Sequence, residues 1–214
     1  MALQLSALRV ELRARLGLAA AADTFGPSTT ILNSFLARAQ NWLYWSYGWE
    51  NLRRTWTFAT IIGQAAYAWP VNGASEVCEP RRNLDVWLNN AGVVTELREG
   101  VPLGLRGTTA NAPPTRYWRN DQANLWPAPD SAAYSVDIEG YMALGPFAAD
   151  TDTVTLDDEP VMELGIALGK FHYGQADAAT YLGLLNTLIQ SLNERDDLTG
   201  EVAPVIAPQQ KGAP

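Results

Sequence analysis

The chain has 214 residues, 47% of them hydrophobic, so it is long enough to bury one or two cores, and its formal net charge is −8. The excess negative charge lies in residues 150–214, which carry 11 acidic and 3 basic side chains, and no basic face that would bind nucleic acid through counterion release is visible. No apolar run approaches the roughly 20 residues needed to cross a bilayer, and Cys78, the single cysteine, excludes an intrachain disulfide and a cysteine-rich metal site.

Two amphipathic helices are predicted in the first fifty residues. The first covers about 3–22, and a break at Gly26 and Pro27 separates it from the second. Within the stretch 29–58 the apolar spacing then changes from helical to alternating. We therefore expect this stretch to join a helical part of the protein to a β part.

Six or seven short strands are predicted between residues 52 and 144. Two of them surround Gly63-Gln64. The segments 83–89 and 93–99 read as a hairpin with Asn90-Ala91-Gly92 as its turn, and 115–130 reads as another. Short strands at intervals of 8 to 12 residues favour a small antiparallel sandwich or barrel.

The chain returns to helix near residue 158, where Asp157 or Asp158 can cap the first of two further helices. The predicted fold class is α+β. A four-helix bundle is formed by residues 1–50 and 150–198, an antiparallel β-sandwich or barrel is inserted at 51–149, and 199–214 form an extended tail.

The tail contains apolar residues that a solvated terminus normally lacks: Val202, Pro204, Val205 and Ile206. Two interpretations stay open. The tail is either a segment that becomes ordered on a partner, by strand addition or in a groove, or a solvated chain end.

Few residues suggest chemistry. His172 is the only histidine, too little for a zinc site or a catalytic triad. The run Asp157-Asp158-Glu159 precedes Pro160 and is better explained by helix capping than by a metal or acid–base cluster. Phosphate-loop, nucleophile-elbow and zincin motifs are absent from the sequence. We expect no catalytic residues, no metal ligands, no cofactor and no enzymatic activity.

The eight tryptophans fall into two groups. Trp42, Trp45 and Trp49 are spaced by three and four residues, so they are predicted to share a face at the end of the second helix, as core or as a subunit contact. The other five are expected to be core, or a carbohydrate platform if several are exposed on one sheet face: Trp56, Trp69, Trp87, Trp118 and Trp126.

The order of several motifs resembles the head-to-tail adaptor proteins of tailed bacteriophages. Five motifs carry this resemblance, in the following order: an aromatic helix end followed by RRT (45–57), GQ-AA-Y-A-WP (63–70), P-T-RYW (114–118), LWPAPD (125–130) and DTDT-V-T-L-D-DE-P (150–160). Each motif is loose by itself, because WPAPD is physically a proline-fixed turn after a strand. Their order and spacing are more specific.

This resemblance implies a non-enzymatic virion protein of the neck, assembled in the host cytoplasm as a ring of twelve copies. Its partners would be further copies of itself, the portal protein and a tail nozzle, stopper or tube protein, with genomic DNA passing through the ring and no membrane partner. The C-terminal tail would dock on the portal. An acidic surface binds phosphates poorly, so Asp157, Asp158 and Glu163 are predicted to face the DNA channel.

Two other functions remain open at this point. The first is a tryptophan-rich carbohydrate-binding module of a tail or cell-wall protein. The second is a hydrolase that uses carboxylates of the β region, such as Glu96 and Asp137.

Overall fold

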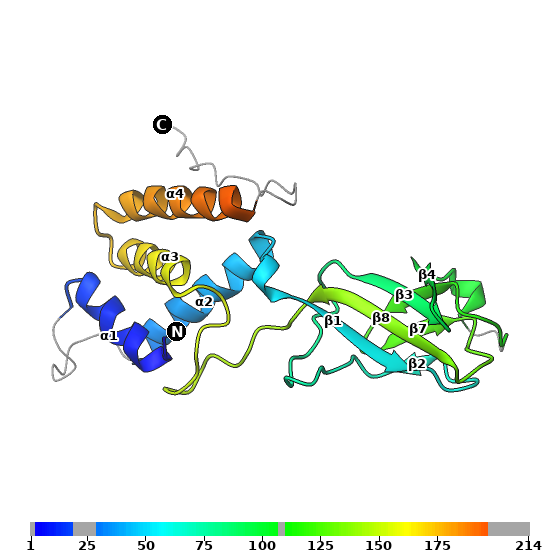
Figure 1. The fold of residues 1–214 in the computed structure, drawn as a ribbon. Coiled ribbons are helices and arrows are strands. Elements are labelled where there is room, and N and C mark those ends of the chain that lie inside the picture. Colours follow the sequence, from blue (N-terminus) through cyan, green and yellow to red (C-terminus); the bar gives the residue numbers. More distant parts are fainter. Residues whose placement is uncertain (1–2, 19–28, 107–109, 197–214) are drawn as a thin grey trace. The chain divides into compact units, whose positions relative to one another are not determined.

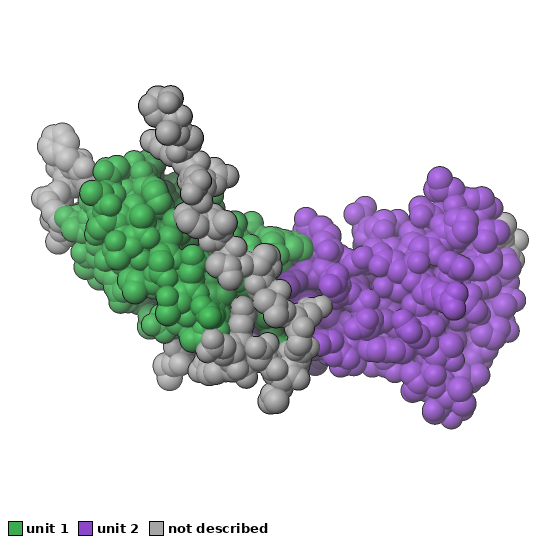
Figure 2. Space-filling model, turned by 90° about the horizontal axis from the view of Figure 1, so that it is seen from above, with its two compact units in different colours: residues 1–50, 144–214 green, residues 51–143 purple. Residues whose placement is uncertain are grey.

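The computed structural model describes residues 3–18, 29–106 and 110–196, and it divides the chain into two compact units. The helical unit comprises Met1–Glu50 and Leu144–Pro214, and the β unit comprises Asn51–Ala143 (Figure 2). The described part of the chain has four α-helices and two mainly antiparallel sheets, so the predicted α+β class is confirmed.

The helical unit is built on α3 (Asp158–His172), which packs against both α2 (Thr29–Ser46) and α4 (Ala178–Asp196). Figure 1 shows α3 lying between these two helices. The first helix, α1 (Leu5–Arg15), contacts α2 and α3. The outer sides of α2 and α4 therefore point away from a shared central helix.

The first helix is shorter than predicted. The expected range was 3–22, but α1 ends at Arg15 because Gly17 adopts a φ of +68°, a left-handed conformation that glycine reaches without strain. The N–H of Leu18 donates to the carbonyl of Arg13, which closes the helix in a Schellman arrangement. Residues 19–22 of the predicted helix lie outside the described part.

Two glycines let α3 approach its neighbours closely. A Cβ on Gly165 would lie 3.1 Å from Cδ2 of Leu36 on α2, and one on Gly169 would lie 2.8 Å from Cδ1 of Leu16. These distances are shorter than the roughly 3.5–4.0 Å of an ordinary carbon contact. Any larger residue at these positions would push α1 or α2 away from α3.

The β unit consists of two four-stranded sheets. The strands of the first sheet, in spatial order, are β1 (Arg53–Ala59), β8 (Tyr134–Tyr141), β3 (Asp85–Asn90) and β4 (Val93–Glu96). Those of the second are β2 (Ala66–Tyr67), β7 (Ala123–Trp126), β6 (Arg116–Arg119) and β5 (Arg98–Glu99). All the strand pairs are antiparallel except β5 with β6, and two short 3₁₀ helices complete the elements, Glu50–Leu52 and Leu103–Leu105.

The two sheets share one hydrophobic core. Alternate residues point inward, so Trp56, Val86 and Ile138 come from the first sheet and Tyr117 and Leu125 from the second. In β8 the inward positions are buried and the outward positions are more exposed, and the pattern alternates from Tyr134 to Gly140. The outer faces of the two sheets consequently point in opposite directions.

The predicted hairpins are present, but the chain changes sheet where none was expected. β3 and β4 pair through a turn in which Ala91 and Gly92 have positive φ, and β6 pairs with β7. The predicted strand 93–99 is divided at buried Leu97 into β4 and β5, which belong to different sheets. The two strands around Gly63-Gln64 also lie in different sheets.

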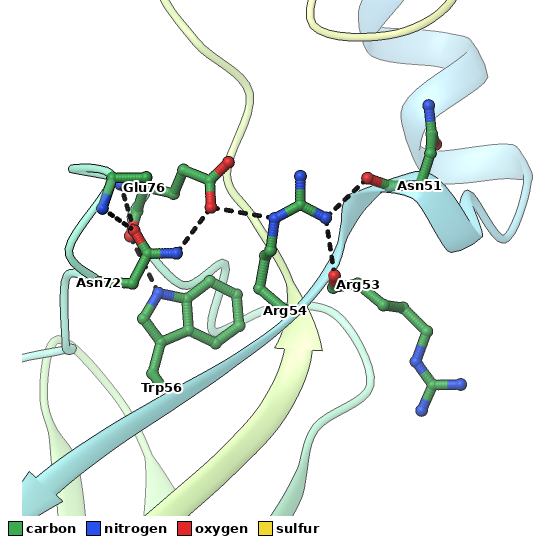
Figure 3. Close-up of polar contacts among 7 residues, drawn as sticks. Asn51, Arg53, Arg54, Trp56, Asn72 and Glu76 are labelled. Carbon is green, nitrogen blue, oxygen red and sulfur yellow. Dashed lines mark hydrogen bonds and ion pairs between the residues drawn. The ribbon is translucent and has the colours of Figure 1, made fainter.

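A polar cluster holds the loop after β2 on the first strand (Figure 3). The carboxylate of Glu76 accepts from Nε of Arg54 at 3.0 Å and from Nδ2 of Asn72 at 2.6 Å. Nε1 of Trp56 donates to the backbone carbonyl of Glu76 at 2.9 Å. The hydrogen bond from the Asn72 amide and that from the Arg54 guanidinium both favour the charged carboxylate, so the pKa of Glu76 lies below its ordinary value.

Candidate functional site

The exposed side of α2 carries a continuous stripe of large side chains. We call Ile31, Phe35, Arg38, Trp42 and Trp45 the α2 stripe, because spacings of four, three, four and three place them along one side of a helix. Trp42 is 38% exposed and Trp45 is 45% exposed. Arg38 is the only charged residue between Thr29 and Ser46.

The structure separates the three tryptophans of the helix end. Because α2 ends at Ser46, Trp49 lies beyond the helix and does not belong to the stripe. It is 6% exposed, and its Nε1 donates to the carbonyl of Leu43 at 3.1 Å, so its ring folds back onto the helix end. Buried Tyr44 contacts the ring of Trp45 at a centroid distance of 5.2 Å and fixes its orientation.

The N-terminal half of the stripe meets the end of α3. The ring of Phe35 lies 5.3 Å from that of His172 and 6.4 Å from that of Tyr173, while the side chain of neighbouring Phe171 is exposed. The histidine thus belongs to an aromatic surface. The helical spacing placed Phe35 on the apolar side of the helix, but it did not assign Phe35 or Arg38 to an exposed contact surface with Trp42 and Trp45.

The outer face of α4 is unusual because it lacks charge. From Ala178 to Ser191 the helix contains no acidic or basic residue, although Leu184 is 53% exposed and Gly183 and Thr187 are also exposed. Solvated helix faces normally carry charged side chains, whereas the centres of protein interfaces are depleted of them. The outer faces of α2 and α4 are therefore the two surfaces of the helical unit best suited to contact other proteins.

The three acidic residues predicted to face a channel have different environments. Asp157 is exposed at the N-cap of α3 and makes no capping bond with its side chain. Both carboxylate oxygens of Asp158 accept from the backbone N–H of Leu3, at 3.2 and 3.0 Å. Glu163 is 13% exposed, and its Oε1 pairs with Arg15 at 2.7 Å while its buried Oε2 has no hydrogen-bond partner among the described residues, so this carboxylate is mostly withdrawn from solvent within the helical unit.

The DTDT segment fastens α1 to the C-terminal half of the unit. The N–H of Leu5 donates to the carbonyl of Asp152 at 2.7 Å, and Arg9 pairs with Asp150 at 2.8 Å. Hydrogen bonds from the N–H groups of Ala148 and Ala149 lower the pKa of Asp152. This motif therefore has a structural role in joining chain segments that are far apart in sequence.

A buried lysine closes the connection between α3 and α4, and the sequence analysis did not identify it. Nζ of Lys170 lies 2.6 Å from a carboxylate oxygen of Asp177, 3.0 Å from Oε1 of Gln175 and 4.8 Å from the ring centroid of Tyr181. Nε2 of Gln175 in turn donates to the carbonyl of Leu16. The network holds the turn that sets the direction of α4.

The β unit offers no concentrated chemical site among its described residues. Trp56 is buried, and the other four tryptophans of this unit are half-buried rather than exposed, so they do not form an open platform. Glu96 and Asp137 lie on opposite sides of Trp87 in the strand register. Within the described ranges, no group of three or more histidine, cysteine, aspartate or glutamate residues is placed to hold a metal ion.

The predicted docking residues of the tail, Val202, Pro204, Val205 and Ile206, lie outside the described part of the chain. Among the described residues, no helix combines the length and apolarity that a bilayer crossing requires.

The helical unit has aromatic, charge-poor helix faces, and such surfaces are typical of a protein that contacts other proteins. A family model described as SU10 adaptor protein matches residues 4–207, so the chain belongs to this family. The resemblance to phage head-to-tail adaptors is thereby confirmed, and the protein is a structural component of the virion in the head-to-tail connection. No curated protein matches the chain.

Proposed function

We propose that the protein is a subunit of a ring of twelve copies that joins the portal of the phage head to the tail and surrounds the DNA channel. Its helical bundle forms the ring, and its inserted β unit projects from it. Assembly takes place in the host cytoplasm. The family match over residues 4–207 carries this proposal, because it covers both units of the chain.

The two charge-poor helix faces support a ring. A ring closes through a heterologous contact, in which one surface of a subunit meets a different surface of the next. The α2 stripe and the outer face of α4 lie on different helices packed against α3, so they meet this requirement. Trp42 and Trp45 supply the large rings that dominate interface energetics, whereas Trp49 belongs to the core of its own subunit.

The channel surface is proposed to include the start of α3. Asp157 and Asp158 retain partly or fully exposed carboxylates there, which would repel DNA phosphates and let the duplex slide. Glu163 contributes less, since its carboxylate is mostly buried and pairs at 2.7 Å with Arg15, which it shares with Glu11.

Contacts above and below the ring complete the proposal. The tail residues Val202, Pro204, Val205 and Ile206 are assigned to docking on the portal, and a nozzle, stopper or tube protein is assigned to the tail side. No catalytic step is proposed for this protein. The carboxylates of the first sheet lie on its outward side and the tryptophans other than Trp56 are half-buried, an arrangement that favours neither hydrolysis nor a carbohydrate platform.

Mass photometry of the protein alone and mixed with its portal tests the proposal. Twelve copies of 23.3 kDa would add about 280 kDa to each portal particle. Binding of one or two copies per portal, or no binding at all, would refute the ring. A variant truncated after residue 198 tests the tail separately, because it should keep its fold and lose portal binding.

A further inference from the structure

The outer faces of the two sheets of the β unit carry opposite charge. On the first sheet the outward positions include four carboxylates, and we call them, with Trp87 at their centre, the acidic face: Asp85, Glu96, Asp137 and Glu139. The strand register places Trp87 beside Asp137 on β8 and beside Glu96 on β4. These three side chains therefore form one row across three strands.

The acidic face is only partly neutralised within the subunit. Arg53 pairs with Glu139 at 2.8 Å and lies 3.8 Å from Asp85. Asp137 accepts a hydrogen bond from the hydroxyl of Thr57 at 2.6 Å, which leaves its charge in place. The guanidinium of Arg82 lies 4.0 Å from the ring centroid of Tyr141 at the end of this face. Counting Arg53 and Arg82 against the four carboxylates, the face keeps an excess of negative charge.

The outer face of the second sheet is basic and aromatic. We call Arg98, Arg106, Arg116, Trp118 and Trp126 the basic face. Arg98 and Arg116 stand side by side in the parallel β5–β6 pair, and Trp126 is opposite Arg116. The guanidinium of Arg106 lies 5.7 Å from the ring centroid of Trp118.

The charge on the basic face is available to a partner. Arg98 and Arg106 are exposed. Nε of Arg106 donates to the neutral backbone carbonyl of Val101, and Nη1 of Arg116 donates to that of Gly100. Glu99 and Arg119 form their ion pair on the opposite side of the sheet, the side of Tyr117. Along the described strands of this sheet, no carboxylate shares the outer face with these arginines.

This basic face is not visible in the sequence, because Arg98 and Arg116 are 18 positions apart and come together only when β5 pairs in parallel with β6. That pairing follows from the change of sheet at buried Leu97, which alternation of apolar residues does not reveal.

We infer that the acidic face of one copy docks on the basic face of the β unit of the next copy. This inference rests on the proposed ring. Copies with a net charge of −8 repel one another, so their contacts must form where local charges are complementary. Arginine is the residue best suited to pair with carboxylates and to stack on a tryptophan ring, and Trp87 offers such a ring between two carboxylates.

The opposite direction of the two faces fits a large ring. Successive subunits of a twelve-membered ring are turned by only about 30°, so the two contact surfaces must lie on nearly opposite sides of each subunit. The outer faces of two sheets that share one core meet this condition. The β units would thus form a second contact layer in addition to that of the helical units.

Charge reversal tests the contact in full-length protein assembled on its portal. Glu96→Arg and Arg98→Glu change exposed side chains of opposite faces. Each variant alone should weaken assembly about tenfold or more, since it introduces a like-charge pair at every subunit contact. The double variant, which restores opposite charges between neighbours, should recover much of the loss. Asp121→Arg, which reverses an exposed carboxylate in the β6–β7 turn, is the matched control and should assemble normally.

The outcomes separate this inference from the ring itself. Rings that form normally in all variants would overturn the contact and leave the proposed function standing. The same conclusion follows if Arg98→Glu loses binding of a tail protein or of DNA while the ring stays intact. Absence of any ring in the unmodified protein would overturn both. Far-UV circular dichroism of each variant confirms that lost assembly is not lost folding.

Discussion

Substitution of Gly169 by alanine probes the closest helix contact of the helical unit. The new Cβ would lie 2.8 and 2.9 Å from the two δ carbons of Leu16, which is buried. Overpacking of this kind costs about 1–3 kcal/mol, and alanine regains about 0.5–1 kcal/mol of helix propensity. We therefore expect Gly169→Ala to lower the free energy of unfolding by about 1 kcal/mol.

A second substitution reverses the sign of this effect. Leu16→Ala alone should cost about 2–5 kcal/mol because it leaves a cavity. It also removes the δ carbons, so adding Gly169→Ala to it should stabilise the protein by about 0.5–1 kcal/mol. Gly183→Ala on α4 is the control, since its Cβ would meet no atom within 4 Å, and it should stabilise the unmodified protein.

Urea unfolding followed by far-UV circular dichroism measures the four variants and the unmodified protein. The reasoning would be refuted if Gly169→Ala stabilised the protein as Gly183→Ala does. It would also be refuted if the effect of Gly169→Ala were the same with and without Leu16, because the clash would then not be with that side chain.

Three further predictions concern the β unit. The pKa of Glu76 is lower in the folded protein than in the unfolded chain, so the charged carboxylate stabilises the fold. This stabilisation is complete above the ordinary glutamate pKa of about 4.3, and it is lost as the pH falls through the lowered pKa of the folded protein. Glu76→Gln should flatten this acid limb of the stability curve, and an unchanged curve would contradict the cluster in Figure 3. Trp56 is 1% exposed, so Trp56→Ala should lower the free energy of unfolding, measured with urea, by about 3–5 kcal/mol. A decrease below about 1 kcal/mol would show that this ring is not part of the core. Burial raises the pKa of Cys78 to about 12, so at pH 8 its thiol should react with a thiol reagent only in denaturant; fast labelling of the folded protein would show an open core.

Helix and strand positions were largely readable from the sequence, because burial of one side imposes a period on each element. The apolar spacing of Leu32, Leu36 and Leu43 predicted α2, and the alternation through Trp56 predicted β1. The end of α1 was missed because alanine-rich residues after Gly17 keep a high helix propensity, while the glycine stops the helix locally.

The assignment of strands to sheets was not readable, for a different reason. Alternation shows which residues point inward but not which sheet they belong to, and both sheets of the β unit feed the same core. Leu97 is inward-facing in either case, so the sequence could not show that the chain changes sheet there. The two charged faces depend on this change and therefore became visible only in the folded chain.

The interaction surfaces were partly predictable. The aromatic character of Trp42 and Trp45 marked the end of α2, and their exposure keeps them available for contacts. The lack of charge along α4 was present in the sequence, but its meaning depended on knowing that Leu184 is exposed rather than buried.

Cryo-electron microscopy of the protein bound to its portal tests the central claim most directly. The account predicts a closed ring of twelve subunits on the portal, with helical units around the channel and Asp157 and Asp158 directed at the DNA. Isolated copies bound at separate portal sites, or a closed ring with these two carboxylates on its outer rim, would contradict it.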